Sequence, residues 1–247
     1  VQRARVDPLG EVIALDRNAM DLASPDSIRH AISVVKPSVI VNAAAYTAVD
    51  RAEVEPALAQ AINASGPGML AEEARRLGVL LVHYSTDYVF DGEKVGAYTE
   101  LDPTNPLGTY GRTKLEGERQ ISNSGCRHII LRTSWVYSER GRNFLLTIRR
   151  LAAERPELRV IDDQFGAPTS APAIADATRS IIRQAMRDNG AGGLFHLTAE
   201  GRTSWHEFAA SSPRVPYPGL HPSFPFLLIN TQPPPDVPAI PASTMRS

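Results

Sequence analysis

Short apolar stretches alternate along the chain with longer stretches in which apolar residues recur every three or four positions. The short stretches are apolar throughout, which is typical of strands buried on both faces of a sheet. Strands are predicted at residues 11–16, 37–42, 79–84, 128–136, 158–161 and 193–197. Because helical patterns separate them, we expect a parallel sheet covered on both faces, the doubly wound α/β class.

Capping residues mark where the intervening helices begin. Ser24 is a good N-cap and Pro25 fits a first helical turn, so a helix is predicted from there to about Val35. Further helices are expected at about residues 55–77, from 110, after 143, at 172–186 and from 203, with residues 1–8 as the tail of one more.

Tyr110 and Lys114 form the pair with the clearest chemical potential. They lie four residues apart at the start of a predicted helix, so they share one face of it. A free tyrosine has a pKa of about 10, too high for ready proton exchange near neutrality. A cation one turn away favours the phenolate, and we therefore expect Lys114 to lower the pKa of Tyr110 and make it a general acid/base.

Several candidate ligand-binding residues fall where predicted strands end. These residues are Asp16, Ala43–Ala45, Thr86 and Trp135. In a doubly wound sheet such ends meet at the ligand-binding edge. A carboxylate like that of Asp16 suits an adenosine ribose 2′-hydroxyl, whereas neighbouring Arg17 suits a 2′-phosphate, so these two residues leave NADH and NADPH both open.

Composition narrows the range of partners. The chain has 247 residues, 43% of them hydrophobic, and a formal net charge of -1. This balance gives no basis for nucleic-acid binding, and no apolar run reaches the roughly 20 residues of a membrane span. Cys126 is the only cysteine, so no internal disulfide is expected and a cytoplasmic protein is predicted. No residues have metal-ligand spacing, and we predict no metal.

Five runs of the sequence together resemble one known family. The runs are Val41–Asp50, Thr86–Gly92, Tyr110–Lys114, Arg132–Tyr137 and Asp163–Thr169. In this order they are similar to the extended short-chain dehydrogenase/reductases and, more narrowly, to the dTDP-4-dehydrorhamnose reductases. The resemblance covers about residues 1–210. It implies a Rossmann-like sheet with a small C-terminal substrate lobe, NADPH or NADH as cofactor, and reduction of dTDP-4-dehydro-β-L-rhamnose to dTDP-L-rhamnose for polysaccharide biosynthesis. It also allows a homodimer.

The resemblance assigns roles to individual residues. Tyr110 would protonate the C4 oxygen of the sugar, Lys114 would assist it and bind the nicotinamide ribose, and Thr86 would donate a hydrogen bond to the same oxygen. Asp87 and Trp135 would contact the substrate beside Thr86. The implied cofactor contacts are Asp16, Arg17, Asp21, Leu22, Ala45, Tyr46, Thr47, Tyr84, Tyr110 and Lys114.

Two stretches depart from the family pattern. The family opens with a strand and a glycine-rich turn for the cofactor pyrophosphate, and none precedes Glu11. We therefore expect a gap in the sheet between the strands at Val12 and Val79, and weak dinucleotide binding by this chain. Frequent prolines after Ala210 predict an irregular tail. The expected parts are a dinucleotide-binding domain at 1–140, a substrate lobe at 141–210 interleaved with the end of the sheet, and the tail at 211–247.

Two other functions share parts of this pattern. A non-catalytic regulatory subunit on the same fold resembles the one that binds methionine adenosyltransferase, but it differs after the Thr86-like position, so Asp87 favours the enzyme. Sugar-nucleotide epimerases and dehydratases share the tyrosine and lysine spacing. The runs Arg132–Tyr137 and Asp163–Thr169 argue against them.

Overall fold

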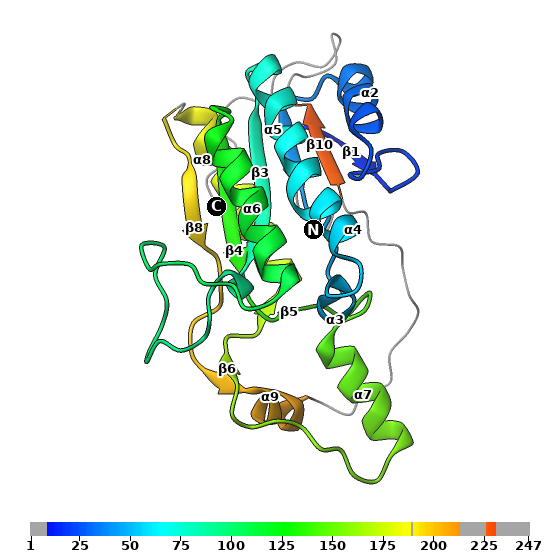
Figure 1. Cartoon of the computed structure of the whole chain (residues 1–247), viewed down its shortest axis with the longest axis vertical. Helices are drawn as coiled ribbons and strands as arrows, with labels where there is room; N and C mark the ends of the chain where they lie inside the picture. Colours follow the sequence, from blue (N-terminus) through cyan, green and yellow to red (C-terminus); the bar gives the residue numbers. More distant parts are fainter. Residues whose placement is uncertain (1–8, 189, 213–225, 231–247) are drawn as a thin grey trace.

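The computed structural model describes residues 9–188, 190–212 and 226–230, and its centre is a six-stranded sheet (Figure 1). The strand order is β1-β10-β2-β3-β4-β8. The strands are β1 (Glu11–Leu15), β2 (Val39–Asn42), β3 (Leu80–Thr86), β4 (His128–Thr133), β8 (Gly193–His196) and β10 (Phe226–Asn230). Four neighbouring strands of the sheet, β2, β3, β4 and β8, run parallel to one another. This arrangement confirms the predicted α/β class.

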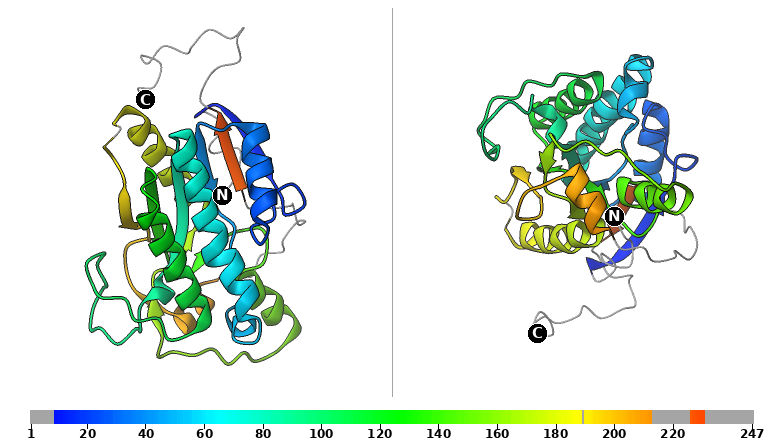
Figure 2. Two further views of the ribbon diagram at one scale, coloured as in Figure 1. Left: turned by 45° about the horizontal axis from the view of Figure 1, so that its top comes forward. Right: turned by 90° about the horizontal axis from the view of Figure 1, so that it is seen from below.

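Helices cover both faces of the sheet because the strands are apolar on both sides. Figure 2 shows α2 (Pro25–Val35), α5 (Gly66–Leu77) and α6 (Thr109–Asn123) over one face of the sheet and α8 (Ala171–Arg187) over the other. Alternate strand residues divide between the two cores, so Ile40 packs with the three helices and Val41 on the α8 side.

The predicted helix at 55–77 is continuous but changes pitch in its middle. It consists of α4 (Pro56–Gln60), a π-helical turn (Ala61–Ser65) and α5, and it follows the short α3 (Val49–Ala52). The π turn carries Asn63, whose buried amide donates to the hydroxyl of Thr113 on α6 at 3.2 Å. The irregular turn therefore lies where two helices are in close contact.

The tail holds a strand, so the prediction that residues 211–247 are irregular is wrong for 226–230. β10 pairs antiparallel with β1 on one side and with β2 on the other. The expected gap between the strands at Val12 and Val79 is also wrong, because β2 pairs directly with β3 and β10 fills the position between β1 and β2. The frequent prolines around it led to this prediction, although Phe226–Asn230 themselves contain no proline and can form a strand.

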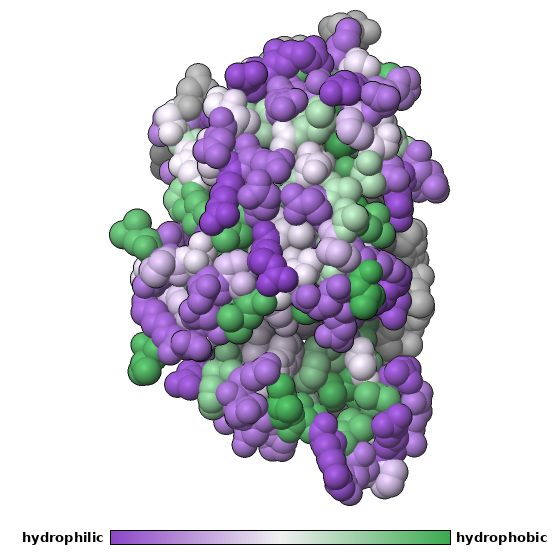
Figure 3. Space-filling model, viewed as in Figure 1, coloured by the Kyte–Doolittle hydropathy of each residue, from purple (hydrophilic) through white to green (hydrophobic). Residues whose placement is uncertain are grey.

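A small lobe lies beyond the carboxyl ends of the strands (Figure 1). It is built from β5 (Val136–Tyr137), α7 (Phe144–Glu154), β6 (Phe165–Gly166), β7 (Thr169–Ser170), β9 (Thr203–Ser204) and α9 (Trp205–Ser211). In Figure 3 the helices over the sheet present mainly hydrophilic side chains, whereas apolar ones gather on this lower part of the molecule.

One predicted strand of the lobe is absent. Residues 158–161 form no strand, and Ile161 is half exposed. The helix expected over residues 1–8 lies outside the described residues. Within the described part, no helix is long and apolar enough to cross a membrane.

Candidate active site

A cavity of about 400 Å³ opens at the carboxyl ends of β2, β3 and β4. Ten predicted site residues line it, namely Ala43, Ala44, Ala45, Thr47, Tyr84, Thr86, Asp87, Tyr110, Lys114 and Trp135. The sequence did not single out other lining residues, which are Val49, Ser85, Tyr88, Thr133, Val136, Ala171, Ile174 and Trp205. Tyr110 and Lys114 therefore face one cavity from one side of α6, as their spacing predicts.

The structure corrects the expected acidity of Tyr110. Burial raises the pKa of Tyr110 to about 12, while a hydrogen bond with Thr86 opposes the shift and the charge of Asp87 adds to it. The Lys114 amine faces the Tyr84 carbonyl and His83 instead, so it does not lower the pKa of Tyr110. Tyr110 is therefore protonated at neutral pH, because burial raises its pKa more than nearby groups lower it.

Lys114 is buried along its whole length, with a side chain 2% exposed. Its Nζ donates to the backbone oxygen of Tyr84 at 2.6 Å and lies 3.1 Å from Nε2 of His83. Burial lowers the pKa of Lys114 to about 8, against a smaller opposite effect of Glu118. The amine can therefore change its charge near neutral pH.

A buried ion pair fixes α6 to the sheet beside the cavity. Arg132 on β4 donates to both carboxylate oxygens of Glu118, at 2.9 and 2.7 Å. Both side chains are nearly inaccessible, and a two-point contact of this kind restricts their geometry. Since Glu118 lies one helical turn beyond Lys114, the pair holds the face of α6 that carries Tyr110 and Lys114 against β4.

Thr86 and Asp87 lie where β3 ends and a short 3₁₀ turn begins. The Thr86 hydroxyl donates to Asp87 at 3.1 Å and accepts from the backbone N–H of Tyr88 at 3.2 Å. Burial raises the pKa of Asp87 to about 6. The turn thus presents a hydroxyl and a poorly solvated carboxyl to the cavity, next to Tyr110.

Tyr84 lines the cavity, and its hydroxyl contacts a helix behind the sheet. The hydroxyl lies 2.6 Å from that of Thr178 on α8, and burial raises its pKa. This contact ties the strand that carries the site to the helix behind the sheet.

Two stacked tryptophans border the cavity. The rings of Trp135 and Trp205 are 3.5 Å apart between centroids and 8° from parallel. Trp135 has a left-handed backbone (φ 46°), and a Cβ on Gly166 would lie well under 3.0 Å from its ring. In the sequence, Ser204 and Glu207 have the spacing of a capping box, which starts α9 and places Trp205 in its first turn.

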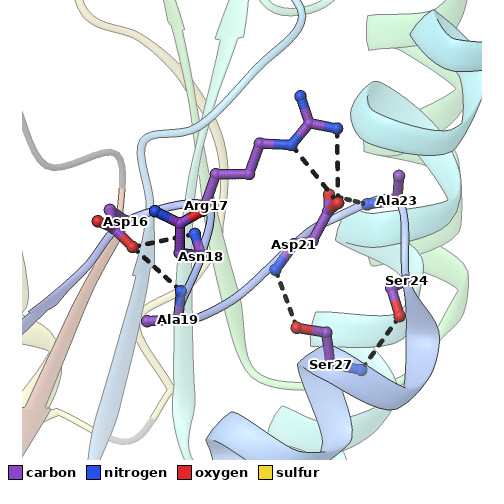
Figure 4. Close-up of polar contacts among 8 residues, drawn as sticks. All are labelled: Asp16, Arg17, Asn18, Ala19, Asp21, Ala23, Ser24 and Ser27. Atoms are coloured by element: carbon purple, nitrogen blue, oxygen red, sulfur yellow. Dashed lines mark hydrogen bonds and ion pairs between the residues drawn. The ribbon is translucent and has the colours of Figure 1, made fainter.

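The residues predicted for the adenosine end lie outside this cavity, in the turn after β1 (Figure 4). Asp16 accepts the backbone N–H groups of Asn18 and Ala19, each at 3.0 Å. Arg17 is exposed and pairs with Asp21 at 3.4 Å. Leu22 is buried in the core, so its side chain is unavailable to a ligand.

Tyr46 also lies away from the cavity wall. Its backbone N–H donates to Asn63 at 2.8 Å, and its hydroxyl donates to Glu55. Ala45 and Thr47 on either side of it do line the cavity. The predicted run after β2 is therefore divided, because Ala45 and Thr47 line the cavity whereas Tyr46 contacts Asn63 and Glu55.

The doubly wound sheet and the tyrosine, lysine and threonine at its carboxyl edge define an oxidoreductase of the extended short-chain dehydrogenase/reductase class. The family model of the RmlD substrate binding domain matches residues 3–212. The dTDP-4-dehydrorhamnose reductase of Burkholderia thailandensis is 49% identical over 205 residues, 81% of this chain and 69% of that protein. That of Escherichia coli K12 is 47% identical over 214 residues, 85% of this chain and 71% of that protein.

Solved structures agree with this assignment. The dTDP-4-dehydrorhamnose reductase of Bacillus anthracis, crystallised with NADP, matches with a TM-score of 0.75 and 35% identity over 79% of this chain and 69% of its own. That of Clostridium acetobutylicum matches with a TM-score of 0.73 and 38% identity, over 80% and 69%. The chain belongs to the dTDP-4-dehydrorhamnose reductase family.

Proposed function

We propose that this chain reduces dTDP-4-dehydro-β-L-rhamnose to dTDP-L-rhamnose with NADPH or NADH, in the biosynthesis of cell-surface polysaccharides. The observation that carries the proposal is the convergence of Tyr110, Lys114 and Thr86 on one cavity at the carboxyl edge of the sheet. Family membership supplies the substrate class, since the relatives are named for this reaction.

The described residues fit the nicotinamide half of the cofactor. Small side chains at Ala43–Ala45 leave the backbone open to a flat ring, and the buried hydroxyl of Ser85 in the cavity wall has no protein partner. Tyr84, Lys114 and Ala45 would hold this half. Asp16 or Arg17 would receive the adenosine ribose, with one Asp16 oxygen already bonded within its own turn.

The bound cofactor supplies a hydride to C4 of the sugar, and the protein supplies the proton and the electrostatic support. Tyr110, with a pKa of about 12, is protonated at neutral pH and can donate its proton to the C4 oxygen. Thr86, whose one hydroxyl proton now goes to Asp87, would turn it to the same oxygen as negative charge develops there. Lys114, with a pKa of about 8, is mostly charged at pH 7, and it would stabilise the tyrosinate by turning its ammonium group from the Tyr84 carbonyl toward Tyr110 once the proton has left.

The lobe closes the substrate side of the cavity. Trp135 and Trp205 offer flat apolar surfaces, which suit a sugar nucleotide that must be kept from water during the reaction. Asp87 adds an acceptor for a sugar hydroxyl.

Turnover with a single substitution tests the proposal. The purified chain should oxidise NADPH or NADH when dTDP-4-dehydro-β-L-rhamnose is added, measured by cofactor absorbance. Tyr110→Phe should lower kcat by at least about 100-fold, the scale of a lost general acid. Tyr88→Phe is the matched control, because it removes the hydroxyl of a more exposed tyrosine at the same cavity. This variant should retain most activity. Turnover that survives in Tyr110→Phe would contradict the assignment.

We also place the reaction in the cytoplasm. Cys126 is a free, buried thiol, which suits a reducing compartment. Fractionation of cells that express the chain, with detection in the soluble cytoplasmic fraction, tests this placement.

A further inference from the structure

Two tryptophans connect the sheet with the small lobe, and both line the cavity. Trp135 lies between β4 and β5, just beyond the end of the sheet, whereas Trp205 lies in the first turn of α9. Their rings are 3.5 Å apart between centroids and 8° from parallel. At this distance the two faces are in van der Waals contact, so the ring of Trp135 cannot turn toward α9.

Trp135 has a backbone conformation that surrounding contacts must maintain. Its φ of 46° is left-handed, which residues with a large side chain seldom adopt. The backbone N–H of Thr169 donates to the carbonyl of Trp135 at 3.2 Å and fixes its main chain. Gly166 bounds the ring, because a Cβ there would lie well under 3.0 Å from the indole. Trp205 supplies a third boundary through the stacked face.

Trp205, by contrast, is held by contacts within the lobe. The hydroxyl of Ser204 accepts from the N–H of Glu207 at 3.1 Å, and the Glu207 carboxylate accepts from the N–H of Ser204 at 3.1 Å. Ser204 also donates to Asp162 at 3.0 Å and has no exposed surface. Phe144 of α7 packs on Trp205 with ring centroids 4.3 Å apart. The start of α9 therefore places Trp205 independently of the stack.

We propose that Trp205 is a positioning residue, which holds the ring of Trp135 in the orientation that meets the sugar nucleotide. The inference rests on the proposed function, in which the tryptophan wall meets the substrate. The direction of support follows from the two environments, because the lobe fixes Trp205 whereas Trp135 needs external contacts to keep its backbone conformation. Loss of Trp205 should therefore weaken substrate binding, while the reacting groups on β3 and α6 keep their places.

A double-mutant cycle distinguishes support from direct contact with the ligand. With dTDP-L-rhamnose as the probe and calorimetry as the measurement, Trp135→Leu and Trp205→Leu should each raise Kd about tenfold. Since Trp205 acts through Trp135, the variant with both changes should also show a rise of about tenfold. A rise of about 100-fold in that variant would mean that Trp205 binds the ligand by itself, and would overturn the proposal. An unchanged Kd in Trp205→Leu would overturn it as well.

Steady-state kinetics separate positioning from a general loosening of the lobe. Trp205→Leu should raise KM for the sugar nucleotide about tenfold and change kcat by less than about threefold. Trp205→Phe keeps a flat ring and should restore most of the lost affinity. Phe208→Leu is the matched control, because Phe208 packs on Trp205 from the same helix but lies outside the cavity wall. An equal rise of KM in Phe208→Leu would contradict the role of the stack.

A readout without ligand separates this inference from the proposed reaction. The chain has two tryptophans, so labelling with 5-fluorotryptophan gives two 19F resonances, which Trp135→Phe assigns. Trp135 should give one narrow resonance in the unaltered chain and in Trp205→Phe, but a broadened or split one in Trp205→Leu. One narrow Trp135 resonance in Trp205→Leu would overturn the proposal. A chain that shows the expected change without turnover would contradict the proposed reaction and still support the positioning role.

Discussion

At the scale of residues, burial decides the chemistry of the cavity more than the neighbouring charges do. The spacing of Tyr110 and Lys114 predicts that they share a face, and they do line one cavity. The sequence could not show that the amine of Lys114 is turned toward Tyr84 and His83, since those contacts join distant segments. The expected lowering of the tyrosine pKa failed for this reason.

Asp87 should weaken the fold at neutral pH. Its pKa is raised to about 6, so between about pH 4 and 6 the folded chain binds a proton more readily than the unfolded chain. The contribution of Asp87 to the free energy of unfolding therefore falls by up to about 3 kcal/mol as the pH rises from about 4 to 6. Asp87→Asn should raise the unfolding free energy at pH 7 by about 1–2 kcal/mol and change it little at pH 4, measured by denaturant unfolding.

The control for this prediction is an exposed carboxylate on α2. Asp26→Asn should show no such gain at pH 7, because Asp26 is exposed. Equal effects of Asp87→Asn at both pH values would contradict the account.

Arg17 should set the choice between cofactors. Its guanidinium now pairs with Asp21, which also caps the N–H of Ala23 at 2.9 Å (Figure 4). Asp21→Asn can keep the cap while releasing Arg17 for a 2′-phosphate, so the ratio of kcat/KM for NADPH over NADH should rise several-fold. Arg17→Ala should lower the same ratio. A ratio that both variants leave unchanged would exclude Arg17 from the cofactor site.

At the scale of elements, close packing of α6 positions the active site. A Cβ on Gly117 would lie well under 3.0 Å from the backbone oxygen of Asn63, and one on Gly111 equally near that of Tyr88. These glycines bracket Lys114, so helix, π turn and 3₁₀ turn approach each other only because both lack side chains. The sequence shows the glycines but not what they face.

Gly117→Ala should therefore push α6 away from the π turn. We expect a loss of about 2–4 kcal/mol in unfolding free energy and a lower kcat, because overpacking against backbone cannot relax easily. Gly68→Ala is the matched control: its Cβ would meet the side chain of Gln120 and no backbone atom, and alanine favours helix by about 1 kcal/mol. Thermal unfolding of both variants tests this explanation. Equal melting temperatures for Gly117→Ala and Gly68→Ala would contradict the role of the contact between Gly117 and the Asn63 backbone.

Most elements follow from local pattern alone. The helix from Pro25 to Val35 forms with Ser24 as its cap, and α6 and α8 begin within about a residue of their predicted starts. The strand expected at 128–136 breaks at Trp135, whose left-handed backbone no periodicity reveals. Local signals thus predict where elements form, whereas partners across the fold decide where they bend or end.

At the scale of the whole molecule, the sheet depends on a strand from far along the chain. Family, fold class and reaction could all be predicted from five sequence runs, and the comparisons confirm them. The position of β10 could not be predicted, because antiparallel insertion between β1 and β2 depends on pairings of very long sequence separation.

A proline in this strand should be poorly tolerated. Leu228 pairs with Ile13 on one side and Ile40 on the other, so Leu228→Pro removes a backbone donor within the sheet. We expect the unfolding free energy to fall by about 3 kcal/mol or more, and Leu228→Val to change it by less than about 1.5 kcal/mol. Similar melting temperatures for the two variants would show that β10 contributes little to the sheet.

The place of β10 also has a consequence during translation. A ribosome that has released Glu11–Leu15 and Val39–Asn42 must add nearly 200 further residues before the strand that joins them exists. Until then both keep unpaired backbone edges, which are prone to association with other nascent chains. Synthesis of this protein should accordingly rely on chaperones more than that of a fold whose neighbouring strands leave the ribosome in succession.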